Sequence, residues 1–278
     1  MTDHFAAFTF VDRITELAEG AQARGVFAVP AGIREFPACL VAEAVGQLAA
    51  WVAMSKIEFR GRPVAALATE TRFHRDVSPG EMLELGVEIE DCDDDAVAYS
   101  GWASVEGAPV IELVHCLGPM LPVEDFDSPD EMRRHFTLLR GRGSPGGRFG
   151  GVDAPRVDVI EHTPGRFARA QLHVPGHARF FADHFPRNPV FPATLLLDSQ
   201  IRLAASLARE VFARTAEPVP ARMTHVKMRS FITPGQVVEI KAALAEERSE
   251  PLRISLSADI DGRTVATARV EFAAKGEQ

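Results

Sequence analysis

The sequence predicts an α+β fold with two similar halves, each an antiparallel sheet wrapped around one long central helix. The first observation is an internal repeat: Pro37 and Pro192 lie 155 residues apart, each before a long apolar segment, and Pro79-Gly80 and Pro234-Gly235 share that offset. Second, both apolar segments are hydrophobic nearly all round, as buried helices are. Third, segments of alternating polarity follow each helix, which is typical of strands that cover it.

Each half is expected to contain a short entry segment, a strand and loop, the helix, and then three or four strands. The clearest expected strands are 82–89, 96–105 and 110–117 in the first half, and 237–244, 252–260 and 264–272 in the second. Glu106-Gly107 and Asp261-Gly262 suit hairpin turns. The predicted division is an N-terminal unit 1–122, a linker 123–153 and a C-terminal unit 154–278. The linker is charged and then Gly-rich, which is typical of a solvated surface segment.

Composition narrows the function classes. The chain has 278 residues and a net charge of −9, with no Lys/Arg cluster longer than a pair, so we expect no nucleic-acid partner. Three cysteines without CxxC spacing favour a reducing compartment and speak against a zinc site. The N-terminus lacks a signal-peptide pattern, and we recognise no membrane-spanning apolar run. We therefore expect a cytoplasmic protein without a membrane partner.

One stretch combines two groups that can move protons. His184 lies on a proline-rich loop, and Asp198 lies inside the apolar helix fourteen residues later. A histidine of near-neutral pKa and a carboxylate can together remove a proton from one carbon and protonate a leaving hydroxyl.

The first half keeps the acid of this stretch but not the histidine. Glu43 takes the place of Asp198 in the repeat. The distance from Gly20 to Glu43 is 23 residues, whereas the distance from Gly165 to Asp198 is 33. About ten residues are thus missing from the first half, in the segment where the histidine loop would lie.

The pattern HFPxxPVxPxxLLLD over residues 184–198 resembles the dehydratases of fatty-acid synthesis that act on 3-hydroxyacyl-[acyl-carrier-protein], which have the hotdog fold. Residues 43–47, EAVGQ, look like the same family's E-A-x-x-Q. The resemblance covers about residues 155–275 well and 8–121 weakly. The chain departs from the family where Arg187, Ala193 and, in the first half, Ala38 replace glycines, and where Arg202 replaces a glutamine.

The resemblance implies a double hotdog, a pseudodimer within one chain that could oligomerise further. Hotdog dehydratases pair side by side, and each site takes its histidine from one unit and its acid from the other. His184 would therefore meet Glu43 in one working site. Asp198 would be the remnant of a second site without a histidine.

The resemblance also assigns roles to the site residues. His184 would remove the proton alpha to a thioester carbonyl, and Glu43 would protonate the beta hydroxyl as water leaves. The backbone N–H of Ala193 would hold the enolate oxygen. Val190, Pro192 and Gln47 complete the expected substrate-binding set.

The implied reaction is dehydration of a 3-hydroxyacyl thioester carried by acyl carrier protein or CoA, without metal or cofactor. Basic side chains near the mouth would meet the carrier's phosphate; Lys227, Arg229 and Arg187 are the expected ones. Three alternatives stay open. These are a hotdog thioesterase, a non-catalytic acyl-thioester-binding hotdog protein and an isomerising dehydratase.

Overall fold

The computed structural model describes residues 4–212, 217–245 and 251–275. The first half contains β1 (Arg13–Ala18), β2 (Gln22–Ala28), α1 (Ala38–Lys56), β3 (Gly61–Pro63), β4 (Leu67–Phe73), β5 (Met82–Cys92), β6 (Ala96–Val105) and β7 (Ala108–Pro122). The connection contains the 3-10 helix η1 (Val123–Asp125) and α2 (Pro129–Arg140). The second half contains β8 (Arg156–Thr163), β9 (Phe167–His173), the 3-10 helix η2 (Arg179–Ala182), α3 (Ala193–Val211), β10 (Pro218–Met228), β11 (Val237–Leu244), β12 (Leu252–Ile260) and β13 (Arg263–Ala274).

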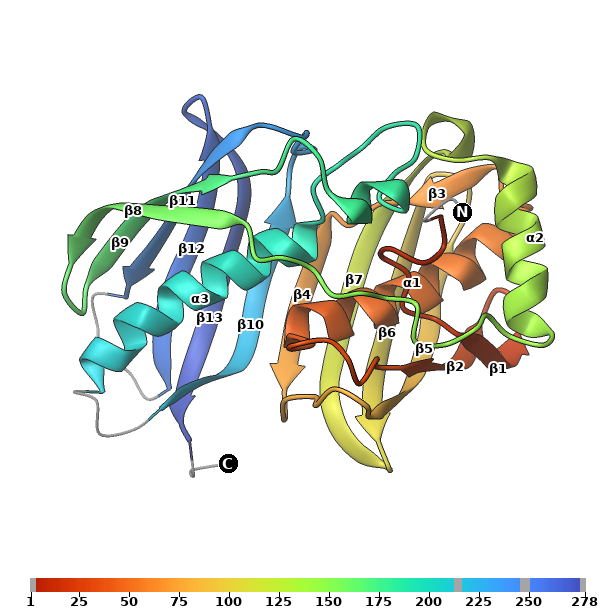
Figure 1. The fold of residues 1–278 in the computed structure, drawn as a ribbon, viewed down its shortest axis with the longest axis horizontal. Coiled ribbons are helices and arrows are strands. Elements are labelled where there is room, and N and C mark those ends of the chain that lie inside the picture. Colours follow the sequence, from red (N-terminus) through yellow and green to blue (C-terminus); the bar gives the residue numbers. More distant parts are fainter. Residues whose placement is uncertain (1–3, 213–216, 246–250, 276–278) are drawn as a thin grey trace.

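The strands form one 13-stranded sheet in the order β1-β2-β5-β6-β7-β4-β10-β13-β12-β11-β9-β8, with β3 paired to β7 off this path. Counted outward from the central pair β4 and β10, the equivalent strands of the two halves come in the same order. These two strands pair antiparallel, with Ala68 opposite Val226, and join the halves into one surface (Figure 1). The six expected strands correspond to β5, β6, β7, β11, β12 and β13, so the fold class predicted from the repeat is confirmed.

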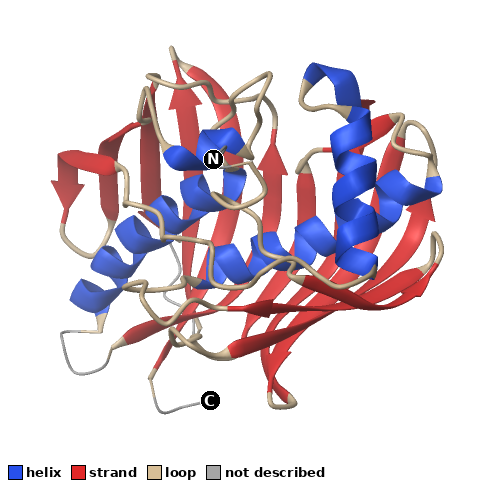
Figure 2. Ribbon diagram, turned by 45° about the vertical axis from the view of Figure 1, so that its right-hand side comes forward, coloured by secondary structure: helices blue, strands red, loops and turns tan. Residues whose placement is uncertain are grey.

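The two long helices lie on the same face of the curved sheet (Figure 2). Pro37 and Pro192 stand at their N-cap positions, where the missing N–H costs no helical hydrogen bond. By length and composition α1 is the one described helix that could cross a membrane, but most of it is buried inside the protein, as in the core helix of a soluble fold. In contrast to the expectation, α3 is not apolar all round, because Arg202 and Arg209 lie exposed along one face.

The hydrogen-bond register locates the ten residues by which the halves differ. The N–H of Val29 donates to the Glu81 carbonyl, as that of Val174 does to Gln236. Phe36 bridges Val77, as Phe191 bonds Ile232. Six residues, 30–35, therefore link the same two points that residues 175–190 link in the second half. The longer segment holds η2 and His184.

The segment 123–153 differs from the solvated linker that was expected. It forms η1 and α2, and Met132, Phe136 and Leu139 of α2 are buried against the first half. The Phe136 ring stacks on Trp51 of α1, with centroids 6.1 Å apart. Farther along, Phe149 packs edge-on against Phe10, so parts of the Gly-rich stretch also belong to the core. The physical reason for the helix is that apolar residues recur at helical spacing after Pro129 and give α2 one face to bury.

Gln200 on α3 carries a prediction about stability. Its side chain is 1% exposed, and neither atom of its amide finds a hydrogen-bond partner among the described residues. Because an unsatisfied buried polar group costs about 1–3 kcal/mol, we expect Gln200→Leu to raise the free energy of unfolding by about that amount. Chemical denaturation measures this, with Gln47→Leu as the matched control. Gln47 makes three hydrogen bonds, so its replacement should destabilise the protein. A loss of stability in Gln200→Leu would contradict this account.

Candidate active site

A cavity of about 230 Å³ lies where the two halves meet. One wall is the face of α1 that carries Glu43, Gly46 and Gln47. The second half contributes the histidine loop and the start of α3. Further lining residues come from the N-terminal segment and from the inner face of the sheet: His4, Phe5, Phe8, Arg62, Tyr99, Leu113, Cys116, Met223 and Val226. His184 and Glu43 thus face one cavity from different halves, as the predicted pairing requires.

The loop fixes the tautomer of His184. Its Nδ1 lies 2.8 Å from the carbonyl oxygen of Val190, and a carbonyl only accepts, so Nδ1 carries the proton. Nε2 of the neutral ring then holds a free lone pair, which is the form of a general base. Burial lowers the pKa of His184 below 6.5, although the charge of Glu43 and the bond to Val190 oppose this. The ring is therefore neutral at physiological pH.

Two side chains hold the Glu43 carboxylate. Its Oε1 accepts from Nε2 of Gln47 at 3.1 Å, one helical turn away. Its Oε2 accepts from the Thr194 hydroxyl at 2.8 Å, which is a bond between the halves. Gln47 also donates to the carbonyl of Phe8 and accepts from the N–H of Phe10, so both hydrogens of its amide are used. Gln47 thus holds Glu43 in position, and since it also lines the cavity, its expected contact with substrate stays a prediction.

The start of α3 presents backbone donors beside these side chains. The first N–H groups of a helix have no intrahelical partner, and the helix dipole makes this end positive. Ala193, the first helical residue, lines the cavity, as Val190 does. Pro192 is not among the described residues that line it. Its carbonyl accepts from Leu195 and Leu196, so Pro192 caps the helix, and its expected contact with substrate stays a prediction.

The N-terminal segment closes one side of the site. The buried Asp183 carboxylate accepts from the N–H groups of Phe5, Ala7 and Phe8 and from the Thr9 hydroxyl. The Phe8 ring lies edge-on to the His184 ring, with centroids 5.7 Å apart. Residues 5–9 are therefore tied to the residue next to His184 and form part of the cavity wall.

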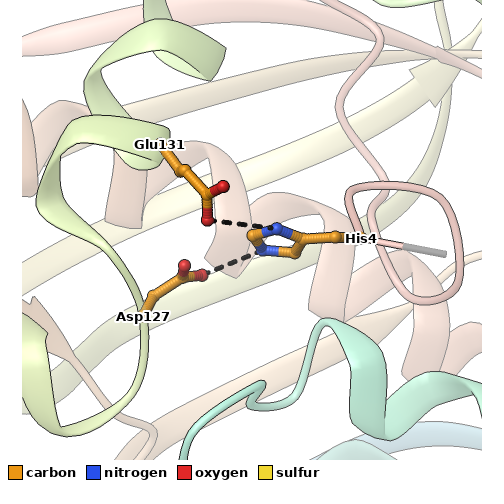
Figure 3. Close-up of side chains that lie close together, drawn as sticks. All are labelled: His4, Asp127 and Glu131. Carbon is orange, nitrogen blue, oxygen red and sulfur yellow. Dashed lines mark hydrogen bonds and ion pairs between the residues drawn. The ribbon is translucent and has the colours of Figure 1, made fainter. Parts of the chain in front are cut away.

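A second set of ionisable groups holds the start of this segment in place (Figure 3). His4 places Nε2 3.1 Å from Asp127 and Nδ1 3.8 Å from Glu131. Burial opposes protonation, but the bond to Asp127 and the charges of Asp127, Asp183 and Glu131 raise the pKa of His4. Because the two ring nitrogens face different carboxylates, the ring bridges two acids. These contacts attach the N-terminal segment to α2 and to the residues just before it.

Asp198 lies outside the cavity in an ion-paired cluster. Its carboxylate accepts from Nε of Arg202 at 2.7 Å, and Arg202 also bonds Glu35 at 2.8 Å. Burial raises the pKa of Asp198, and Arg202 partly offsets this. The position that holds Gln47 in the first half is Arg202 here. The positive charge of Arg202 therefore pairs with the Asp198 carboxylate.

The basic residues expected near the mouth do not line the cavity in the described part of the chain. Arg187 donates to the Glu124 carbonyl, and Arg229 donates to Thr267. Lys227 is exposed. Sequence reasoning also missed Arg62, Asp183 and Thr194, which carry no motif signal. The hydroxyl of Thr194 at a helix start was the one available hint.

Comparisons with known proteins place the chain in a family. A family model described as ApeI-like, ApeI dehydratase, matches residues 161–269. The 3-hydroxyacyl-[acyl-carrier-protein] dehydratase FabZ of Bartonella bacilliformis is 30% identical over 114 residues, which are 40% of this chain and 74% of that protein. FabZ of Bacillus subtilis is 35% identical over 128 residues, which are 41% of this chain and 91% of that protein. The chain belongs to the hotdog-fold dehydratase family.

Most of this family member, including both halves, resembles solved thioesterases in fold. The 12:0-ACP thioesterase of Umbellularia californica superposes with a TM-score of 0.56 at 12% identity, over 91% of this chain and 94% of that one. An acyl-ACP thioesterase of Bacteroides thetaiotaomicron gives 0.55 at 11% identity, over 91% and 98%. These likenesses concern the double hotdog fold alone.

Proposed function

We propose that this protein removes water from a 3-hydroxyacyl thioester to give a trans-2-enoyl thioester, with His184 as base and Glu43 as acid. The observation that carries the proposal is the shared cavity, which brings a neutral histidine from one half opposite a carboxylate from the other. Relatives named for acyl-carrier-protein substrates support a thioester on that carrier, and a CoA thioester has the same reacting atoms.

The chemistry follows from the positions of the donors. His184 Nε2 takes a proton from the alpha carbon, and the thioester oxygen gains charge beside the N-terminus of α3. The Glu43 carboxylate receives this proton from the His184 imidazolium, through water, and passes it to the beta hydroxyl, while the carbon–oxygen bond breaks and water leaves. Both groups are then back in their starting forms. Thr194 and Gln47 hold the carboxylate in place during these steps.

The pH dependence of the reaction should report the environment of His184. Because its pKa is lowered below 6.5, the base stays deprotonated as the pH falls from 8 to that value. We expect kcat/KM for enoyl-thioester hydration to lose activity on the acid side only below pH 6.5. An acid limb centred above pH 6.5 would contradict the described environment.

The proposal is tested by hydration of crotonyl-CoA, followed by loss of the enoyl absorbance. We expect activity in the wild type and a loss of about 10²- to 10⁴-fold in His184→Ala. His173→Ala is the matched control, because His173 pairs with Asp158 away from the cavity. Full activity in a folded His184→Ala variant would refute the assignment.

A further inference from the structure

Arg62 on β3 is a cation of the cavity wall without a role in the steps above. Its side chain is 17% exposed and is one of the groups that line the cavity. The guanidinium lies over the Phe185 ring, 4.2 Å from the centroid, and Phe185 stacks on His184 at 4.1 Å. The Phe185 ring thus lies between the Arg62 guanidinium and the imidazole of His184.

The donors of Arg62 are poorly used by the protein itself. Its Nη1 lies 3.8 Å from the sulfur of Met132, which is a weak acceptor, and 3.6 Å from Asp127 Oδ2, beyond hydrogen-bond distance. Each Asp127 oxygen already accepts one hydrogen bond, one from His4 and one from the N–H of Ser128, so its contact with Arg62 is an ion pair only. Within the described part of the chain, Arg62 donates to no oxygen. A guanidinium has five N–H donors, so this partly exposed side chain keeps donors that a ligand in the cavity could use.

The surrounding charges determine which kind of acceptor these donors can bind. Asp127 lies beside Arg62, and the charges of Glu43 and Asp183 also act on it. Three carboxylates around one cation disfavour a phosphate or a carboxylate ligand, whereas a neutral oxygen adds no repulsion. A thioester substrate offers two kinds of neutral carbonyl oxygen: the thioester carbonyl and the amides of a pantetheine arm.

We infer that Arg62 binds the substrate by donating hydrogen bonds from its guanidinium to a neutral carbonyl oxygen. This inference rests on the proposed function and adds to it a binding residue for the substrate. Charged donors make stronger hydrogen bonds than neutral ones, so one lost bond corresponds to about 10- to 100-fold in affinity.

The test measures binding apart from turnover. Calorimetry gives the dissociation constant of butyryl-CoA, which has no double bond to hydrate, for wild type, Arg62→Met and Arg62→Lys. We expect weakening of about 10- to 100-fold in Arg62→Met. Arg62→Lys keeps the charge beside Asp127, so it should fold more readily than Arg62→Met. It loses the planar set of guanidinium donors, so we expect it to weaken binding less than Arg62→Met does. Arg253→Met, which removes an exposed arginine that pairs with Glu271 outside the cavity, should bind as the wild type does.

Hydration of S-ethyl thiocrotonate, which has no amide, shows whether Arg62 binds the thioester carbonyl or a pantetheine amide. A loss of kcat/KM in Arg62→Met with both crotonyl-CoA and this compound assigns the thioester carbonyl, and a loss with crotonyl-CoA alone assigns an amide. Unchanged binding in folded Arg62→Met and Arg62→Lys overturns the inference, even where the wild type hydrates both. A wild type that binds butyryl-CoA through Arg62 but hydrates nothing overturns the proposed dehydration and leaves the binding role.

Discussion

Replacing Glu43 by Gln should lower enoyl-thioester hydration by about 10²- to 10⁴-fold, whereas Asp198→Asn should leave it within a few-fold of the wild type. The two acids occupy equivalent positions of the repeat. Glu43 lines the cavity with His184, but Asp198 lies outside it and pairs with Arg202. Steady-state kinetics on crotonyl-CoA measures both variants.

The pair of variants is its own control, because each replaces a carboxyl group by an amide in the second turn of a core helix. The oxygen of the new amide can accept from Gln47, and its NH₂ group can donate to the Thr194 hydroxyl, so folding should be retained in Glu43→Gln. The reverse pattern, activity lost in Asp198→Asn and kept in Glu43→Gln, would mean that the working site uses the acid of the second half.

Asp183→Asn should lower the free energy of unfolding by about 3 kcal/mol or more and reduce activity strongly. The buried carboxylate accepts from three backbone N–H groups and one hydroxyl of the N-terminal segment. An amide has one acceptor oxygen, and its NH₂ group would face donors. The segment would then detach, and Phe8 would no longer pack against His184.

Asp12→Asn provides the comparison for this prediction. Asp12 accepts from a single backbone N–H, that of Ala28, at 2.7 Å. We therefore expect a loss of about 1 kcal/mol there, with activity kept. Denaturant titration and the hydration assay on both variants give the result. Equal effects of the two substitutions would show that Asp183 has no special part in holding the segment.

The repeat explains why so much of the fold was predictable. Apolar helices behind Pro37 and Pro192 and alternating strands behind Pro79-Gly80 and Pro234-Gly235 carry local signals, and each half supports the interpretation of the other. Both glycines of these turns have positive φ, 93° at Gly80 and 81° at Gly235, which only glycine adopts readily. The length difference between the halves likewise located the missing loop.

What sequence reasoning missed depends on contacts between distant segments. The bonds from Asp183 to the N-terminal segment span more than 170 residues, and Thr194 reaches Glu43 from another helix. Arg62 lies on a three-residue strand that has no periodicity to detect. The helix α2, in contrast, could have been predicted from local signals. Pro129, an acidic first turn and Arg140 at the end are ordinary helix signals, but the charge and glycine content of the surrounding stretch indicated a linker.

The most direct measurement supplies a 3-hydroxybutyryl thioester and follows two signals in one reaction: enoyl absorbance and free thiol. The central claim predicts that enoyl thioester forms, no thiol is released, and His184→Ala abolishes the signal. Release of thiol without enoyl absorbance would contradict it and would identify the protein as a thioesterase, the activity named for the solved structures that share its fold.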